Sequence, residues 1–334
     1  MNSRFPEKNK KPGVYYAFTD DGVELPVIDI TSPMFAENAS QKELAALSEG
    51  FLRLQKMPLF IRHFLMRHSV LGRGMKSDSD GFLKGMTTYV VKLRPEVLGK
   101  GYAGLIDRKV AGAIGSVSFR RRLQGMARLI ADRLVSALRE RKRTCVHLLS
   151  IGGGPTMDIL NSLILIQKEN PGLLTGRHIL IRVFDLDEIG PHFGANALTS
   201  LSVESGPLHG IDITLDHISY DWAHVSMLRE TIGRIDAYDV AICSSEGALF
   251  EYGSNEVIAE NLKVLRETTP AFLEVIGSIV CDNNISQAIG GMSTVSFRTF
   301  ELDDFHNLAL SVGWTVGRVL EVNPLYWIVM LKKA

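Results

Sequence analysis

Short apolar segments that alternate with helical segments constrain this chain more than any other feature of its sequence. From residue 145 on, runs rich in Val, Ile and Leu predict strands, and the stretches between them carry apolar residues at helical spacing. The predicted strands are residues 145–151, 179–185, 212–221, 239–245 and 271–280. Strands joined by crossover helices form a parallel sheet that is covered on both faces. We therefore expect an α/β fold with a doubly wound, mostly parallel sheet.

The end of the chain predicts a different kind of pairing. Two further strands, residues 316–322 and 326–333, are separated only by Asn323, Pro324 and Leu325. Such a short link requires antiparallel pairing. The sheet is therefore expected to have seven strands and to finish in an antiparallel C-terminal hairpin.

The first part of the chain has another character. Apolar residues recur at helical spacing over 47–68 and 119–141, with Gly and Ser between the periodic stretches. We expect residues 1–143 to form a mostly helical N-terminal cap, which binds substrate or makes a homodimer, and residues 144–334 to form the catalytic domain. Candidate cap residues for contacting a substrate are Phe64, Met66, Phe82, Tyr89, Arg94, Tyr102 and Arg108.

Charge and composition exclude some partners. Lys+Arg and Asp+Glu both number 37, which gives a formal net charge of +0 and no field that would gather nucleic acid. The basic run Arg120–Arg122 is interpreted as a solvated helix face. No apolar run approaches the roughly 18 to 20 residues that span a bilayer, and the three cysteines lie in or beside apolar runs, as reduced core thiols do. We expect a cytoplasmic protein without membrane contact and without a metal.

The strongest local motif is a glycine turn, HLLSIGGGPTMD over residues 147–158. An apolar strand runs straight into three glycines, and a helix begins near Thr156. Glycines let the backbone approach a ligand closely, and ligands of open α/β sheets bind outside the carboxyl ends of the strands. The candidate ligand-binding residues here are Ser150, Gly152, Gly153, Gly154 and Pro155.

Acidic residues follow the next two predicted strands. Asp185 ends the second strand, where a carboxylate can accept both ribose hydroxyls of a nucleoside, and Leu186 and Asp187 come directly after it. Asp187 is an alternative to Asp185, or a cap of the following helix. The third strand ends with Tyr220, Asp221 and Trp222, and Asp216 is the competing acid if that strand is shorter.

The fourth strand ends in Ser244, Ser245 and Glu246, and Glu251 and Tyr252 lie in the loop that follows. Glu246 is the candidate general base, because burial would raise the pKa of its carboxyl toward a useful value, or it is a ligand for a cationic amine. Tyr252 and Tyr89 complete the set of candidate catalytic residues.

The order of these features resembles the class I S-adenosylmethionine-dependent methyltransferases of small molecules. The resemblance covers roughly residues 144–334 and implies S-adenosyl-L-methionine as cofactor and a small-molecule methyl acceptor. It implies that Gly152 and Gly154 face the methionine part, that Asp185 holds the ribose, and that Asp221 and Trp222 hold the adenine. Ser244 and Ser245 would lie under the transferred methyl group. The family usually has an acid two positions before the first glycine, where this chain has Ser150.

Two other interpretations stay open. An NAD-dependent oxidoreductase would also use a glycine turn and Asp185, but the third glycine of its motif is absent, because Met157 stands there. The second is a non-catalytic binding protein with the same core. Transfer of an aminopropyl group on the methyltransferase fold is also open. The acceptor atom, O, N or C, is not specified by the sequence.

Overall fold

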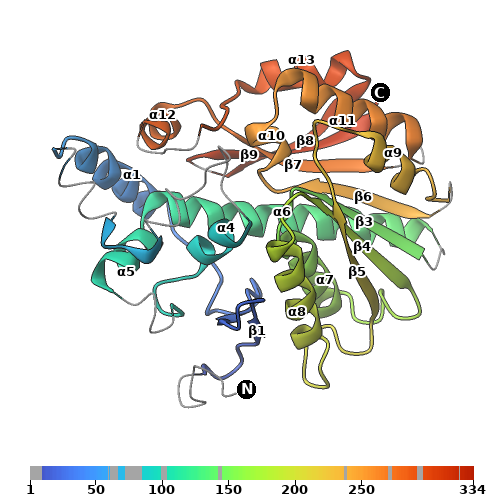
Figure 1. Cartoon of the computed structure of the whole chain (residues 1–334), viewed down its shortest axis with the longest axis horizontal. Helices are drawn as coiled ribbons and strands as arrows, with labels where there is room; N and C mark the ends of the chain where they lie inside the picture. The colour runs from blue at the N-terminus through green and yellow to red at the C-terminus, as the bar shows by residue number, and fades with distance from the viewer. Residues whose placement is uncertain are drawn as a thin grey trace.

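A seven-stranded mixed sheet forms the centre of the computed structural model (Figure 1). The structure describes residues 10–58, 60, 67–71, 85–98, 104–141, 145–236, 239–269, 273–291, 296–322 and 324–334. The strand order is β5-β4-β3-β6-β7-β9-β8. The predicted fold class, with its seven strands and antiparallel C-terminal hairpin, is confirmed.

Five parallel strands and two antiparallel ones make up this sheet. They are β3 (Cys145–Ile151), β4 (His178–Asp185), β5 (Asp212–Ser219), β6 (Val240–Ser245), β7 (Glu274–Val280), β8 (Trp314–Val322) and β9 (Tyr326–Lys333). β9 lies between β7 and β8 and is antiparallel to both. The third parallel strand ends at Ser219, two residues before its predicted end, because the Asp221 carboxylate accepts the Ala223 N–H and starts a turn.

Helices cover both faces of the sheet, because successive strand residues point to opposite sides. One face carries α6 (Ile114–Glu140), α7 (Met157–Glu169) and α8 (Ile189–Leu201), and the other carries α9 (Ser226–Ile232), α11 (Asn255–Thr268) and α13 (Leu302–Ser311) (Figure 1). In β3, Val146 and Leu148 belong to the first core, and Leu149 and Ile151 belong to the second. The two short helices α10 (Leu249–Tyr252) and α12 (Asn284–Gly290) follow β6 and β7.

The chain order of the strands reverses between β3 and β6. From β3 the sheet grows through β4 to β5 in one direction, and from β6 through β7 in the other. A crevice forms outside the carboxyl ends of the strands at such a reversal, because the crossover helices leave on opposite faces. The glycine turn after β3 and the Ser-Ser-Glu segment that ends β6 therefore meet at one place.

The N-terminal part contributes helices and one small hairpin. β1 (Tyr16–Phe18) and β2 (Glu24–Pro26) pair with each other, and β1 lies along α8. The described helices that precede α6 are α1 (Gln41–Gln55), α4 (Gly85–Lys92) and α5 (Leu105–Ala111), and Ser40 and Glu43 close a capping box at the start of α1.

α6 packs on α7 and on β6 to β9, so this helix covers the sheet although it precedes residue 143. The division of the chain at residues 143 and 144 stays a prediction. Within the described part of the chain, no helix has both the length and the apolar content needed to cross a membrane.

Candidate functional site

The glycine turn after β3 folds back over the ends of β3 and β4. Gly152 and Gly154 have φ of +62° and +51°, a region that favours glycine. The Gly152 N–H donates to the Phe184 carbonyl over 2.7 Å, and the Gly154 N–H donates to Oδ2 of Asp185 over 2.9 Å. The turn is thus held by the end of the neighbouring strand.

Close approach of other groups explains why these positions lack a side chain. A Cβ on Gly152 would lie 2.4 Å from the Cβ of Ala248 and 2.9 Å from the Trp222 ring. A Cβ on Gly154 would lie 2.8 Å from the Cα of Gly85, in helix α4. Ala248 itself has φ 44° and ψ −108°, an unfavourable backbone conformation of the kind that concentrates at functional sites.

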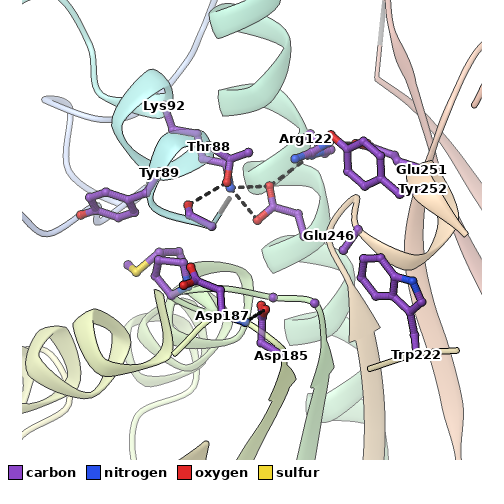
Figure 2. A pocket seen from close by; sticks show the side chains of 16 residues that line it. Thr88, Tyr89, Lys92, Arg122, Asp185, Asp187, Trp222, Glu246, Glu251 and Tyr252 are labelled. Carbon is purple, nitrogen blue, oxygen red and sulfur yellow. Dashed lines mark hydrogen bonds and ion pairs between the residues drawn. The ribbon is translucent and has the colours of Figure 1, made fainter. Parts of the chain in front are cut away.

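A pocket opens above this turn at the sheet reversal (Figure 2). Nine of the predicted site residues line it: Tyr89, Gly152, Gly153, Pro155, Asp185, Asp187, Trp222, Glu246 and Tyr252. Glu251, which the sequence analysis placed in the same loop, lines it too, as do Gly85, Thr88, Lys92, Arg122, Met157 and Ala248. The structure therefore brings together residues of the helices α4, α6, α7 and α10 and of the segments that follow β3, β4, β5 and β6.

Seven predicted residues lie off the pocket wall: Ser150, Gly154, Leu186, Tyr220, Asp221, Ser244 and Ser245. Tyr220 is buried and donates its hydroxyl hydrogen to Asn261 over 2.6 Å. Asp221 is exposed and contacts the Ala223 N–H and the His224 ring. Asp216, the competing acid, lies in the middle of β5 and is exposed.

Asp185 and the glycine turn form what we call the turn side of the pocket, defined as Gly152, Gly153, Gly154 and Asp185. The carboxylate of Asp185 accepts backbone N–H groups at both oxygens, from Gly154 and, over 3.0 Å, from Asp187. Burial raises the pKa of Asp185, and these two N–H groups partly offset that effect. His217 contacts the Asp185 carbonyl over 2.9 Å and holds the strand end from β5.

The opposite wall is built from paired charges, and we call Lys92, Arg122, Glu246 and Glu251 the charged side (Figure 2). Lys92 Nζ lies 2.7 Å and 2.8 Å from the two carboxylate oxygens of Glu246. Arg122 donates from Nε to Glu246 over 3.2 Å and from its terminal nitrogen to Glu251 over 2.5 Å. Burial lowers the pKa of Lys92 and raises that of Glu251, against the effect of their ion-pair partners.

Arg122 corrects one interpretation of the sequence. The run Arg120–Arg122 is not a solvated face, because the side chains of Arg120 and Arg122 are only 5% and 2% exposed. Arg120 pairs with Glu37, and the guanidinium of Arg122 lies over the rings of Phe119 and Tyr326 at 4.9 Å and 4.7 Å. Helical spacing alone does not reveal this, since the partners lie far away in the sequence.

The other cap candidates divide into described and undescribed residues. Tyr89 presents only part of its ring to the pocket, and Figure 2 shows its hydroxyl directed away from Glu246. That hydroxyl contacts the Pro26 carbonyl and the Ile28 N–H instead. Arg94 binds the Ala36 carbonyl, and neither it nor Arg108 lines the pocket. Phe64, Met66, Phe82 and Tyr102 lie outside the described residues.

A second polar cluster lies at the opposite, amino ends of β3 and β6. Cys145, His147 and Asp239 place three ligand-type atoms within 4.8 Å of one another. However, Arg182 lies 3.0 Å from Nδ1 of His147 and can only donate, so Nε2 carries the proton and faces Asp239 over 3.1 Å. A metal bound at Nε2, the nitrogen that faces Cys145 and Asp239, would need the other tautomer, in which Nδ1 carries the proton.

The sheet order and the reversal define the class I methyltransferase fold. No protein-family model matches the sequence, and no curated protein sequence matches it. Among solved structures, a protein from Bordetella parapertussis described as a possible exported protein has a TM-score of 0.56 at 16% identity. The match covers 91% of this chain and 99% of that one.

Structures of small-molecule methyltransferases are also similar. Magnesium protoporphyrin IX methyltransferase from Synechocystis PCC 6803 has a TM-score of 0.42 at 13% identity, over 71% of this chain and 90% of that one. The 1,6-didemethyltoxoflavin-N1-methyltransferase from Burkholderia thailandensis has a TM-score of 0.39 at 12% identity, over 64% and 78%. At such identities the likeness concerns the fold.

Proposed function

We propose that this protein is an S-adenosylmethionine-dependent methyltransferase that acts on O, N or C of a small molecule. One observation carries the proposal. The glycine turn and Asp185 are joined by a hydrogen bond of 2.9 Å and face one pocket at the sheet reversal. A turn that a ligand can approach closely therefore lies beside a carboxylate that can accept ribose hydroxyls, which supports binding of a nucleoside with an amino-acid tail.

The residues of the turn side fit such a cofactor. Each oxygen of Asp185 accepts one backbone N–H and keeps a further lone pair that a ribose hydroxyl can use. Trp222 offers a flat face beside the turn, and we propose that it lies along the adenine. We also propose that Asp221 holds the adenine amine, which requires its outward-facing carboxylate to leave the Ala223 N–H and the His224 ring.

The bound cofactor would supply an activated methyl group, so the protein mainly has to align the acceptor. Thr88 and Lys92 of α4 and Tyr252 of α10 line the pocket, and in this proposal they contact the methyl acceptor. Both roles suggested for Glu246, base and amine ligand, require an oxygen that Lys92 releases or shares. A helical cap that excludes water around the reacting atoms is consistent with the buried charges here.

Calorimetric titration with S-adenosylhomocysteine tests the proposal. We expect wild type to bind, and Asp185→Ala to bind about 100-fold more weakly, because two charge-assisted hydrogen bonds to the ribose are lost. Asp216→Ala is the matched control, since it removes an exposed acid from the neighbouring strand and should leave affinity unchanged. Binding of NAD in place of the nucleoside thioether would favour the oxidoreductase, and binding of neither would leave no support for either enzyme.

The proposal also covers the class of acceptor, the cellular location and the oligomeric state. We propose a small-molecule acceptor rather than nucleic acid, in keeping with the balanced charge of the chain. The three cysteines are unpaired, and two of them are buried, which fits a cytoplasmic location. A homodimer formed through the helical N-terminal part also remains part of this proposal.

A further inference from the structure

A group of buried polar side chains lies directly beneath the turn side. The hydroxyls of Ser150, Thr156 and Ser244 and both carboxylate oxygens of Asp158 are buried without a hydrogen bond of full geometry. The Ser244 hydroxyl and the Ile159 N–H nevertheless lie near enough to Asp158 to lower the pKa of its carboxyl. Buried polar atoms are rarely left in this state, and exceptions at a candidate site point to a function. Asp158 is the most costly of the four, because it is 0% exposed and ionisable.

The four residues are connected in space. A Cβ on Gly153, which lines the pocket, would lie 1.9 Å from the Ser150 hydroxyl, so Ser150 sits immediately below the pocket floor. Ser150 is paired with Ser244 in the register of β3 and β6. The Ser244 hydroxyl in turn lies close enough to Asp158 to lower the pKa of that carboxyl. A polar path therefore leads from the floor of the pocket to the first turn of α7.

Charges from three elements face Asp158. Burial raises the pKa of Asp158 to about 6, Glu246 at the end of β6 adds to that effect, and Lys92 of α4 opposes it. The Cys243 thiol of β6 is also near enough to be affected by this carboxylate. With Asp158 ionised, the carboxylates of Asp158, Glu246 and Glu251 outnumber the two cations of the charged side by one, and the Asp185 carboxylate of the turn side adds a further negative charge.

We infer that Asp158 supplies, from helix α7, the negative charge that methyltransferases of this class usually carry at the position of Ser150. The charge balances the cationic methionine end of S-adenosylmethionine, whose sulfonium and amine outnumber its single carboxylate by one positive charge. Asp158 does not line the pocket, so it acts as a positioning residue through the field it sets beneath Gly153. The inference rests on the proposed function.

Affinity for S-adenosylmethionine, measured by calorimetry at pH 5.0 and pH 7.5, tests this role. Wild type should bind about tenfold more tightly at pH 7.5, because Asp158 is then ionised. Asp158→Asn keeps the shape of the side chain and should bind at both pH values as weakly as wild type does at pH 5.0. Burial also raises the pKa of Asp185 and of Glu251, but both residues are unchanged in the variant, so the difference between the two proteins isolates Asp158.

A rescue variant separates charge from structure. Ser150→Asp in the Asp158→Asn background moves the carboxylate to the position that the family uses, and we expect it to restore at least half of the lost affinity and the pH dependence. Wild-type affinity and pH profile in Asp158→Asn would overturn the inference and leave the proposed function standing. Loss of affinity without rescue, or with an unchanged pH profile, would also overturn it. Failure of wild type to bind at either pH would remove both.

Discussion

The two sides of the pocket hold their carboxylates in different ways. On the turn side, the Asp185 carboxylate is held by backbone N–H groups, both from residues close to the ends of β3 and β4. On the charged side, Glu246 and Glu251 are held by side-chain cations that come from the N-terminal helices α4 and α6. Backbone donors are fixed by the sheet itself, whereas the cations depend on packing between parts of the chain that are distant in sequence.

The comparison indicates a division of tasks. Backbone donors such as those of the turn side are unaffected by most side-chain substitutions and suit a ligand that is always the same, such as a cofactor. A wall of long side chains can be rebuilt by substitution and suits a ligand that differs between enzymes of one fold. The turn side is therefore expected to tolerate little backbone change, and the charged side to respond to the loss of any one charge.

Removal of Arg122 should give the largest effect. Arg122→Ala leaves two buried carboxylates without their shared cation and should lower the free energy of unfolding by about 3 to 5 kcal/mol. Arg128→Ala is the matched control on the same helix, where an exposed two-pronged pair with Glu169 is lost at a cost of about 0.2 to 1 kcal/mol. Urea unfolding measures both losses, and equal losses would mean that the buried network adds no more to stability than an exposed ion pair.

The second largest effect is expected on the pH dependence of the free energy of unfolding, to which Asp158 below the turn side contributes. Its pKa is about 6 in the folded chain and 3.8 ordinarily, so the folded state binds the extra proton between these values. Stability from this group is therefore present below about pH 4 and falls as the pH rises through 6, by about 3 kcal/mol.

Asp158→Asn removes this contribution from the pH dependence. Between pH 4.5 and pH 7, wild type should lose about 2 kcal/mol of the free energy of unfolding relative to the variant in urea unfolding, because part of the change already lies below pH 4.5. Parallel curves for the two proteins would mean that Asp158 is not protonated on folding. Together with the affinity measurement, the expected result makes Asp158 a residue that lowers stability in exchange for ligand binding.

A smaller effect is expected from the glycine turn itself. Gly154→Ala places a methyl group at φ +51° and 2.8 Å from the Gly85 backbone, which should cost about 1 to 3 kcal/mol and loosen α4. Gly172→Ala is the control, because it has φ +83° but no neighbour within 4 Å, and should cost about 1 kcal/mol. Thermal unfolding of the two variants checks this, and a smaller loss for Gly154→Ala would show that α4 adapts easily.

The turn side was the predictable part of the site, for a physical reason. Strand periodicity and the glycine motif lie within one segment, so residues 147–158 and Asp185 could be placed at the carboxyl edge from local patterns. The fold class followed from the same alternation. Lys92 and Arg122 could not be found in this way, because in the sequence they resemble ordinary solvated positions of helices.

Strand ends set the other limit. The third strand was expected to reach Asp221 but stops at Ser219, so Asp221 turns outward and Trp222 takes the place on the pocket wall. Ending the strand two residues earlier changes its length little, but it decides which side chain lies on the pocket wall. Asp158 was visible in the motif, but only its complete burial distinguishes it from a helix-capping acid.

The span of the contacts also orders the events by which the pocket is made. Gly154 and Asp185 are 31 positions apart, whereas Lys92 and Glu246 are 154 apart. Closing a longer loop costs more chain entropy and is slower. The turn side can therefore form before the charged side is complete. During synthesis, Lys92 leaves the ribosome before Glu246, so the ion pair between the two can form only after Glu246 has emerged. The complete pocket is therefore expected to form late in folding, when helix α4 and the end of β6 have come together.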